Sequence, residues 1–219
     1  MFKKIVGAVT VTALMSGCVS VQNKPLAADA SKGLAHKSLA YTEYARADFA
    51  AMTAGKAMFG ALGGAAMVHA GNQIVTDNHI GDPALDISAA LAARLQSSQG
   101  MTLASAPVRV PKDDVGTLVA HANGADYLLD VKTLNWMFAY YPSSWSHYHV
   151  SYAARMRLID VHTHAVVAET MCKANQPTNE AEAPTHDQLI ADHAAKLKTF
   201  VGQEVQDCVN LLSSQILHI

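Results

Sequence analysis

Two closely spaced pairs of histidines are the residues best suited to chemistry in this chain, which has eleven histidines among 219 residues. His147 and His149 stand two residues apart, as do His162 and His164. On a strand, the first pair points to one side with about 7 Å between its members. Zinc needs three or four ligands that converge at about 2.0–2.1 Å, so each pair alone is an incomplete site. Roughly thirteen residues, about 40 Å of strand, separate the pairs, so we expect solvated histidines and no metal.

No nucleophile or phosphate-binding motif accompanies these histidines. The chain lacks Gly-X-Ser-X-Gly, His-Glu-X-X-His and the Walker A loop. We therefore expect no catalytic residue, no cofactor and no enzymatic activity. The alternative is a metal-dependent hydrolase that uses the hairpin histidines, and three convergent His or carboxylate groups in a concave pocket would support it.

A second group is the aromatic cluster of residues 136–152, which holds seven of the fourteen aromatic residues. The stretch from Tyr140 to Trp145 also contains Pro142 and two serines, a composition typical of an exposed hairpin tip. Trp and Tyr suit wet interfaces, because one end of the ring is apolar and the other forms hydrogen bonds. Tyr140, Tyr141 and Trp145 are therefore candidate partner-binding residues. An aromatic plug beneath the loop is the alternative.

Arg155 and Arg157 are candidates for binding phosphate or carboxylate groups of a partner. Between residues 147 and 158, apolar residues alternate with His, Ser, Ala and Arg, as in a half-buried antiparallel strand. The two arginines fall on the polar face of this strand. A plain solvated face is therefore the other interpretation of these residues.

Two cysteines of the domain, Cys172 and Cys208, are expected to pair. Cys172 ends the strand that returns from the hairpin, and Cys208 lies on the apolar stripe of the predicted last helix. That stripe must pack on the sheet, which brings the two thiols to one interface. In an exported protein we therefore expect a Cys172–Cys208 disulfide, which leaves no free thiolate nucleophile among them.

The third cysteine, Cys18, follows an export signal. Lys3 and Lys4 precede an apolar run from Ile5 to Met15 and two small residues. The run is well short of the ~20 residues that span a bilayer. Met-Ser-Gly-Cys resembles the lipobox of bacterial lipoproteins, which implies a lipidated Cys18 and permanent membrane attachment; plain secretion is the alternative. The absence of aspartate after the cysteine favours the periplasmic face of the outer membrane.

Removing residues 1–17 leaves 202 residues, enough for one domain with a sizeable core. Residues 18–36 are rich in Ala, Ser, Lys and Asp, and we predict a lipidated flexible tether before a periplasmic domain of residues 37–219. The loss of two lysines leaves 14 basic against 18 acidic residues, a net charge of −4. Clustered basic residues are absent, so we expect no nucleic-acid partner.

A glycine-rich segment, residues 54–71, stands out in the first half of the domain. Residues 57–68 carry no charge, and as a helix they would rise about 18 Å against a hydrocarbon core of about 30 Å. Small residues would line one helical face and permit close contact; they are Ala57, Gly60, Ala61, Gly64 and Val68. Membrane contact or partner docking is one interpretation, and a buried helix or glycine-rich turn is the other.

The remaining elements follow from local signals. A strand is predicted at residues 37–44, a helix at 82–100 between Asp82 and Gly100, a second helix at 112–124 and a long strand at 125–141. A long hairpin at about 146–172 and a capped final helix at 185–217 complete the chain. The order predicts an α+β single domain with a mostly antiparallel sheet packed by helices.

Three stretches of this order resemble a known group of proteins: "DPALDISAALAARL", "GADYLLDVKTLNW" and "ARMRLIDVHTHAVVAE". Over about residues 37–172 the chain is similar to uncharacterised proteobacterial envelope lipoproteins related to the CsgG, TolB N-terminal and LpoB families. The resemblance implies a non-enzymatic domain that binds other envelope proteins or assembles in the envelope. It leaves self-association open, including a subunit of an oligomeric pore. The glycine-rich segment, the aromatic cluster and the C-terminal helix depart from the pattern.

Overall fold

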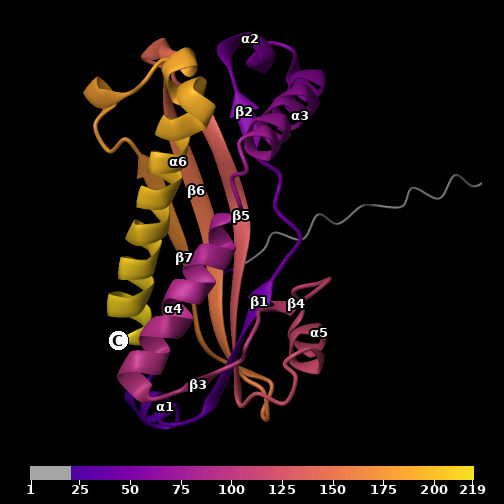
Figure 1. Cartoon of the computed structure of the whole chain (residues 1–219), viewed down its shortest axis with the longest axis vertical. Helices are drawn as coiled ribbons and strands as arrows, with labels where there is room; N and C mark the ends of the chain where they lie inside the picture. Colours follow the sequence, from indigo (N-terminus) through magenta and orange to yellow (C-terminus); the bar gives the residue numbers. More distant parts are fainter. Residues whose placement is uncertain (1–20) are drawn as a thin grey trace, which may run out of the picture.

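The computed structural model describes residues 21–219 (Figure 1). The predicted signal segment 1–17 and the predicted lipid site Cys18 lie outside the described residues. Two long helices, α4 (Pro83–Gln99) and α6 (His186–Leu211), lie across one face of a mixed sheet. On the opposite face, the short helix α5 (Val115–Ala120) covers a smaller second core.

The sheet has seven strands, in the order β3-β1-β5-β6-β7, with β2 beside β5 and β4 beside β1. Its strands are β1 (Ser38–Glu43), β2 (Ala50–Met52), β3 (Thr102–Leu103), β4 (Val108–Arg109), β5 (Tyr127–Tyr141), β6 (Ser144–Asp160) and β7 (Ala165–Gln176). The three long strands pair antiparallel, and the short ones join β1 and β5 in parallel. The α+β fold and the predicted 146–172 hairpin are confirmed. The longer β5–β6 hairpin precedes it, so the hairpin predicted from the sequence is the second half of a meander.

The helix termini follow the predicted signals. Asp82 accepts a hydrogen bond from the Ala84 amide at 2.9 Å, and Gly100 ends α4 with φ of 65°, a left-handed conformation that suits glycine. Thr185 and Gln188 form the predicted capping box of α6. After α6 the chain continues through a π-helical segment, η2 (Leu212–Leu217). A short 3₁₀ segment, η1 (Glu180–Glu182), precedes the capping box.

The glycine-rich segment forms α2 (Ala54–Ala57) and α3 (Gly60–Asp77). Of the small residues predicted to line one face, Ala57, Gly60, Ala61 and Gly64 are exposed and Val68 is half-buried, so this face does not pack within the domain. The buried face of α3 is Gly63, Met67, Gly71 and Val75. A Cβ at Gly71 would lie only 2.0 Å from the carbonyl oxygen of Phe49, so this glycine is what lets α3 approach β2. Apart from Gly63 and Met67, the first half of α3 is largely exposed, so the segment is buried along only part of its surface.

Residues 21–36 pack against the domain instead of forming the predicted tether. Lys24 pairs with Glu169 of β7 through both backbone hydrogen bonds, at 2.7 and 2.9 Å. Leu26 and Leu34, on either side of α1 (Ala28–Lys32), are buried in the main core. The prediction overlooked these two leucines among polar and small residues. Their burial gives the segment the apolar contacts that a flexible linker lacks.

Among residues 21–219, no helix combines the length and the apolar character needed to cross a membrane.

Candidate functional site

The predicted aromatic tip is the turn between β5 and β6. β5 ends at Tyr141 and β6 begins at Ser144, so Pro142 and Ser143 form the turn. Trp145 is 68% exposed, whereas Tyr140 and Tyr141 are half-buried. The tip thus presents one large aromatic side chain to solvent. Tyr140 and Tyr141 are consecutive residues of β5, so their side chains point to opposite faces of the sheet.

Two open concavities border the tip. One, of about 600 Å³, is lined by Tyr141, His149, Lys173, Ala174, Asn175, Pro177, Thr178 and Asp207. The other, of about 460 Å³, is lined by Ser144, His147, Glu180 and Ala181. The rings of Tyr141 and His149 lie 4.9 Å apart. Burial, and then Glu180, raise the pKa of Tyr141, and burial lowers the pKa of His149, so both rings are neutral near pH 7.

Arg155 and Arg157 do not lie on a solvated face, and this corrects the sequence prediction. They are only 6% and 7% exposed. The loop before α5 covers them, and Arg157 donates to the Asp113 carbonyl at 2.6 Å. Arg155 also lies ten residues beyond Trp145 along β6, about 33 Å, so the arginines and the aromatic tip are separate sites.

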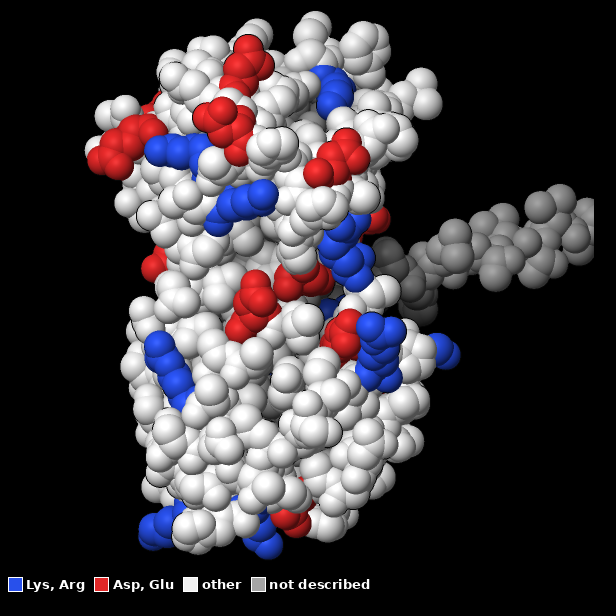
Figure 2. Space-filling model, in the orientation of Figure 1, with Lys and Arg blue, Asp and Glu red and all other residues white. Residues whose placement is uncertain are grey.

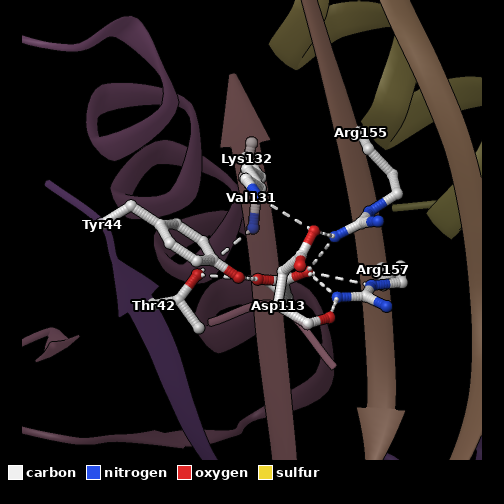
Figure 3. Close-up of polar contacts among 8 residues, drawn as sticks. Thr42, Tyr44, Asp113, Val131, Lys132, Arg155 and Arg157 are labelled. Atoms are coloured by element: carbon white, nitrogen blue, oxygen red, sulfur yellow. Dashed lines mark hydrogen bonds and ion pairs between the residues drawn. The ribbon is translucent and has the colours of Figure 1, made fainter. Parts of the chain in front are cut away.

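The partners of the two arginines are Asp130 and Asp113, and Figure 3 shows both arginines with Asp113. Arg157 donates to Asp130 through Nε at 2.9 Å and Nη2 at 2.7 Å. Arg155 lies 3.0 Å from Asp113 and 3.5 Å from Asp130. Lys132 completes the set by contacting Asp113 at 3.0 Å. Figure 3 shows the arginines on one side of Asp113 and Lys132 across from them.

Two hydroxyl groups approach this buried charge cluster from β1 and the residues after it. Thr42 donates to Asp130 at 3.2 Å, and Tyr44 also donates to Asp130. Burial, with Asp130 as the next cause, raises the pKa of Tyr44, so it stays a phenol that can donate. Burial alone would raise the pKa of Asp113, but hydrogen bonds from Lys132 and Arg155 outweigh it and lower this pKa. The cluster therefore holds three cations and two carboxylates and links β1, β5 and β6 with the loop before α5.

A groove surrounds Tyr44 above this cluster. It consists of three concavities of about 550, 270 and 260 Å³, each of which Tyr44 helps to line. Of the charged groups at its rim, Arg109 contacts Glu43 at 3.3 Å, and Arg46 donates a hydrogen bond to the Thr76 hydroxyl at 2.7 Å. The groove is large enough for a small polar molecule. The polar groups named at its rim, however, already bond to other residues of the domain.

Asp130, Asp113 and Tyr44 are not among the site residues predicted from the sequence. One signal was available: Asp130 interrupts the apolar run "YLLDV" of a strand with two buried faces. A carboxylate there requires a buried cation, and Arg155 and Arg157 on the neighbouring strand supply two.

The histidines are placed apart from one another. His147 bonds to Ser144 at 2.7 Å, and His162 bonds to Asp126 at 3.0 Å at the opposite end of β6. Within residues 21–219, no group of three or more His, Cys, Asp or Glu side chains is arranged to hold a metal ion.

The Cys172–Cys208 disulfide is present, with 5.5 Å between the Cα atoms. It links β7 to α6, and both cysteines are buried in the main core. The prediction from the apolar stripe of the last helix is confirmed.

No protein-family model matches the chain, and no curated protein matches it either. Solved structures resemble it at low identity. The hypothetical protein CT253 of Chlamydia trachomatis is 13% identical over 61% of this chain and 81% of its own, with a TM-score of 0.40. A PelC dodecamer from Paraburkholderia phytofirmans is 13% identical over 89% and 93%, with a TM-score of 0.38. Lipoprotein GNA1162 of Neisseria meningitidis is 12% identical over 82% and 99%, with a TM-score of 0.28. Likeness at this level carries no argument about function.

Proposed function

We propose that the chain is a lipoprotein of the outer membrane, attached through Cys18, whose periplasmic domain binds another envelope protein through the β5–β6 tip. The observation that supports this is the exposure of Trp145 at a turn whose neighbouring residues, Tyr141 and Ser144, each help to line an open concavity. Aromatic side chains beside pockets contribute much of the energy at protein interfaces. The tip acts by binding, without catalysis.

The base of the tip is rigid, which favours binding by a preformed surface. Phe138 packs edge-to-face against Tyr148, with 5.6 Å between ring centroids, and His186 at the start of α6 packs against both rings. The backbone of Tyr148 is also held in place, because its amide donates a hydrogen bond to the carbonyl oxygen of Pro184 at 2.9 Å. A partner would therefore meet Trp145 without first ordering the hairpin.

Crosslinking in intact envelopes, followed by affinity capture, tests the binding role. Trp145→Ala should lower capture of the crosslinked partner at least about tenfold while the thermal midpoint moves by less than about 2 °C, since an exposed side chain contributes little to folding. Tyr141→Ala should add to the loss. Met171→Ala, at an exposed apolar residue of β7, is the matched control and should capture normally. Equal capture by all variants would overturn the proposal.

The anchor is tested separately. Mass spectrometry of the purified chain should find lipid on an N-terminal Cys18, and Cys18→Ala should leave the outer-membrane fraction. A Cys18→Ala chain that still fractionates with the outer membrane would contradict the anchor while leaving the binding role of the tip intact.

A further inference from the structure

Three large apolar side chains cluster at the turn between α2 and α3. They are Met58, Phe59 and Leu62, exposed by 83%, 72% and 82%. We call these three residues the apolar apex. Among residues 21–219, the other exposed large hydrophobic residues, Leu134, Trp145 and Met171, stand singly. Single exposed apolar residues are common on protein surfaces, but three largely exposed apolar side chains within five consecutive residues call for an explanation.

The apolar apex is held in place by the domain. Gly71 of α3 sits against the backbone of Phe49. Asn72 accepts a hydrogen bond from the Phe49 amide at 2.9 Å and donates to Asp48 at 2.7 Å. Figure 1 shows α2 and α3 at the end of the molecule away from α1, beside β2. The second half of α3 is thus fixed to the domain, and the apex lies at the other end of this helix.

The charge around the apex fits a phospholipid surface. Lys56 is the only charged residue from Ala54 to Thr76, and this stretch contains no carboxylate. Figure 2 shows mostly uncharged surface over α2 and the start of α3. A basic residue beside exposed apolar side chains favours anionic headgroups, whereas nearby carboxylates would oppose them. The uncharged run 57–68 rises only about 18 Å as a helix, which suits contact with the interface and not a span.

Chain length places the apex within reach of the same bilayer as Cys18. Lys24 is fixed beside Glu169, which lies level with Asp130 across β6. The strand beneath the apex, β2, meets β5 from Met137, seven residues beyond Asp130, or about 23 Å. The six residues from Cys18 to Lys24 span at most about 20 Å. An anchor of that length is shorter than the distance along the sheet from Lys24 to the apex, so the apex reaches the bilayer when the long axis of the domain tilts toward the membrane.

We propose that the apolar apex inserts into the phospholipid surface to which the chain is anchored. This inference rests on the proposed lipid anchor at Cys18 but not on the partner-binding role of Trp145. One lipid signal combined with a second apolar and basic contact strengthens attachment. The apex would also fix the orientation of the domain on the membrane.

Site-directed spin labelling of the full mature chain tests the contact. Leu62→Cys is labelled with a nitroxide, and the protein is reconstituted in vesicles of phosphatidylethanolamine and phosphatidylglycerol. The label should become accessible to oxygen, which partitions into lipid, and protected from a water-soluble nickel chelate. Met171→Cys is the matched control, because Met171 is an exposed apolar residue of β7, and its label should stay accessible to the chelate.

Two outcomes would overturn the contact between the apex and lipid, and a third concerns the anchor. A Leu62 label as open to the chelate as the Met171 label overturns the insertion. Dipolar broadening between Leu62 labels without oxygen accessibility would instead assign the apex to a second copy of the chain and overturns the lipid contact. Absence of lipid on Cys18 in mass spectrometry would overturn the anchor alone. The Leu62 label would then be measured with the same vesicles added to the chain, and protection from the chelate would still support the contact.

Discussion

Arg157 donates two hydrogen bonds to Asp130, from Nε at 2.9 Å and from Nη2 at 2.7 Å, and both side chains are buried. The pair lies between β5 and β6, and Arg155 and Thr42 share the same carboxylate. Asp130→Ala should therefore lower the free energy of unfolding by about 3–5 kcal/mol, because it leaves buried guanidinium groups without their counter-charge. Urea denaturation measures this loss.

Arg109→Ala is the control for that prediction. Its pair with Glu43 spans 3.3 Å, but the Arg109 side chain is 82% exposed. Exposed pairs contribute about 0–1 kcal/mol, so this variant should unfold near the wild-type urea midpoint. Similar losses in the Asp130 and Arg109 variants would show that the buried cluster stabilises no more than a surface pair.

Sequence reasoning succeeded where the signal is local. Asp82 and Gly100 bound α4 as predicted, because capping and left-handed backbone depend on a few neighbouring residues. It failed for Arg155 and Arg157, since the cover over them comes from the loop at Asp113, forty residues earlier in the chain. Alternation along β6 identifies two faces but cannot say that α5 and its loop cover the second.

For the candidate site too, features that depend on neighbouring residues follow from the sequence, and features that depend on distant parts of the chain do not. The exposure of Trp145 follows from a proline and serines in a tight turn, which are local. The tether prediction failed because Leu26 and Leu34 find their apolar contacts in elements far along the chain. Leu62 of the apex and the buried Gly71 belong to one helix, α3, and composition alone could not tell which half of it packs.

Substitution by Ala at Gly71 and at Gly64, both in α3, should change the stability of the domain in opposite directions. A methyl group at Gly71 would meet the Phe49 carbonyl oxygen at 2.0 Å, so Gly71→Ala must push α3 from β2 and should cost about 1–3 kcal/mol. Gly64 has no atom within 4 Å of a new Cβ, and Gly64→Ala should raise stability by about 0.5–1 kcal/mol through helix propensity. Thermal unfolding of the two variants compares them directly. Equal shifts would mean that α3 does not rely on the close approach at Gly71.

The Cys172–Cys208 disulfide closes a loop with a sequence separation of 36 residues. For such a loop, the chain-entropy model gives about 4 kcal/mol of stabilisation. Replacing both cysteines with Ala should lower the free energy of unfolding by about that amount, measured in urea. Wild-type protein unfolded in the presence of a reductant is the matched comparison and should lose a similar amount. Peptide mapping that finds two alkylatable thiols in the native chain would contradict the link.

Glu204 of α6 makes stability depend on pH. Its side chain is fully buried, and neither carboxylate oxygen has a hydrogen-bond partner. Burial, and then Asp207, raise its pKa from 4.5 to about 9. Because the folded chain holds a proton that the unfolded chain releases between those values, stability should fall as pH rises through this window. Below about pH 4.5 the carboxyl is neutral in both states and imposes no cost; near pH 7 the cost is about 3 kcal/mol.

Glu204→Gln removes the ionisable group while keeping its size. The stability difference between the variant and the wild type should be smallest near pH 4 and should grow in favour of the variant up to about pH 9, since only the wild type must retain a proton in the folded state. Urea midpoints at several pH values, read as the difference between the two proteins, cancel the titration of the histidines that both share. The difference should flatten above about pH 9, where the carboxyl is ionised in both states. A difference that stays constant from pH 5 to 9 would show that Glu204 is ionised in the folded chain and that a polar group or water satisfies its carboxylate.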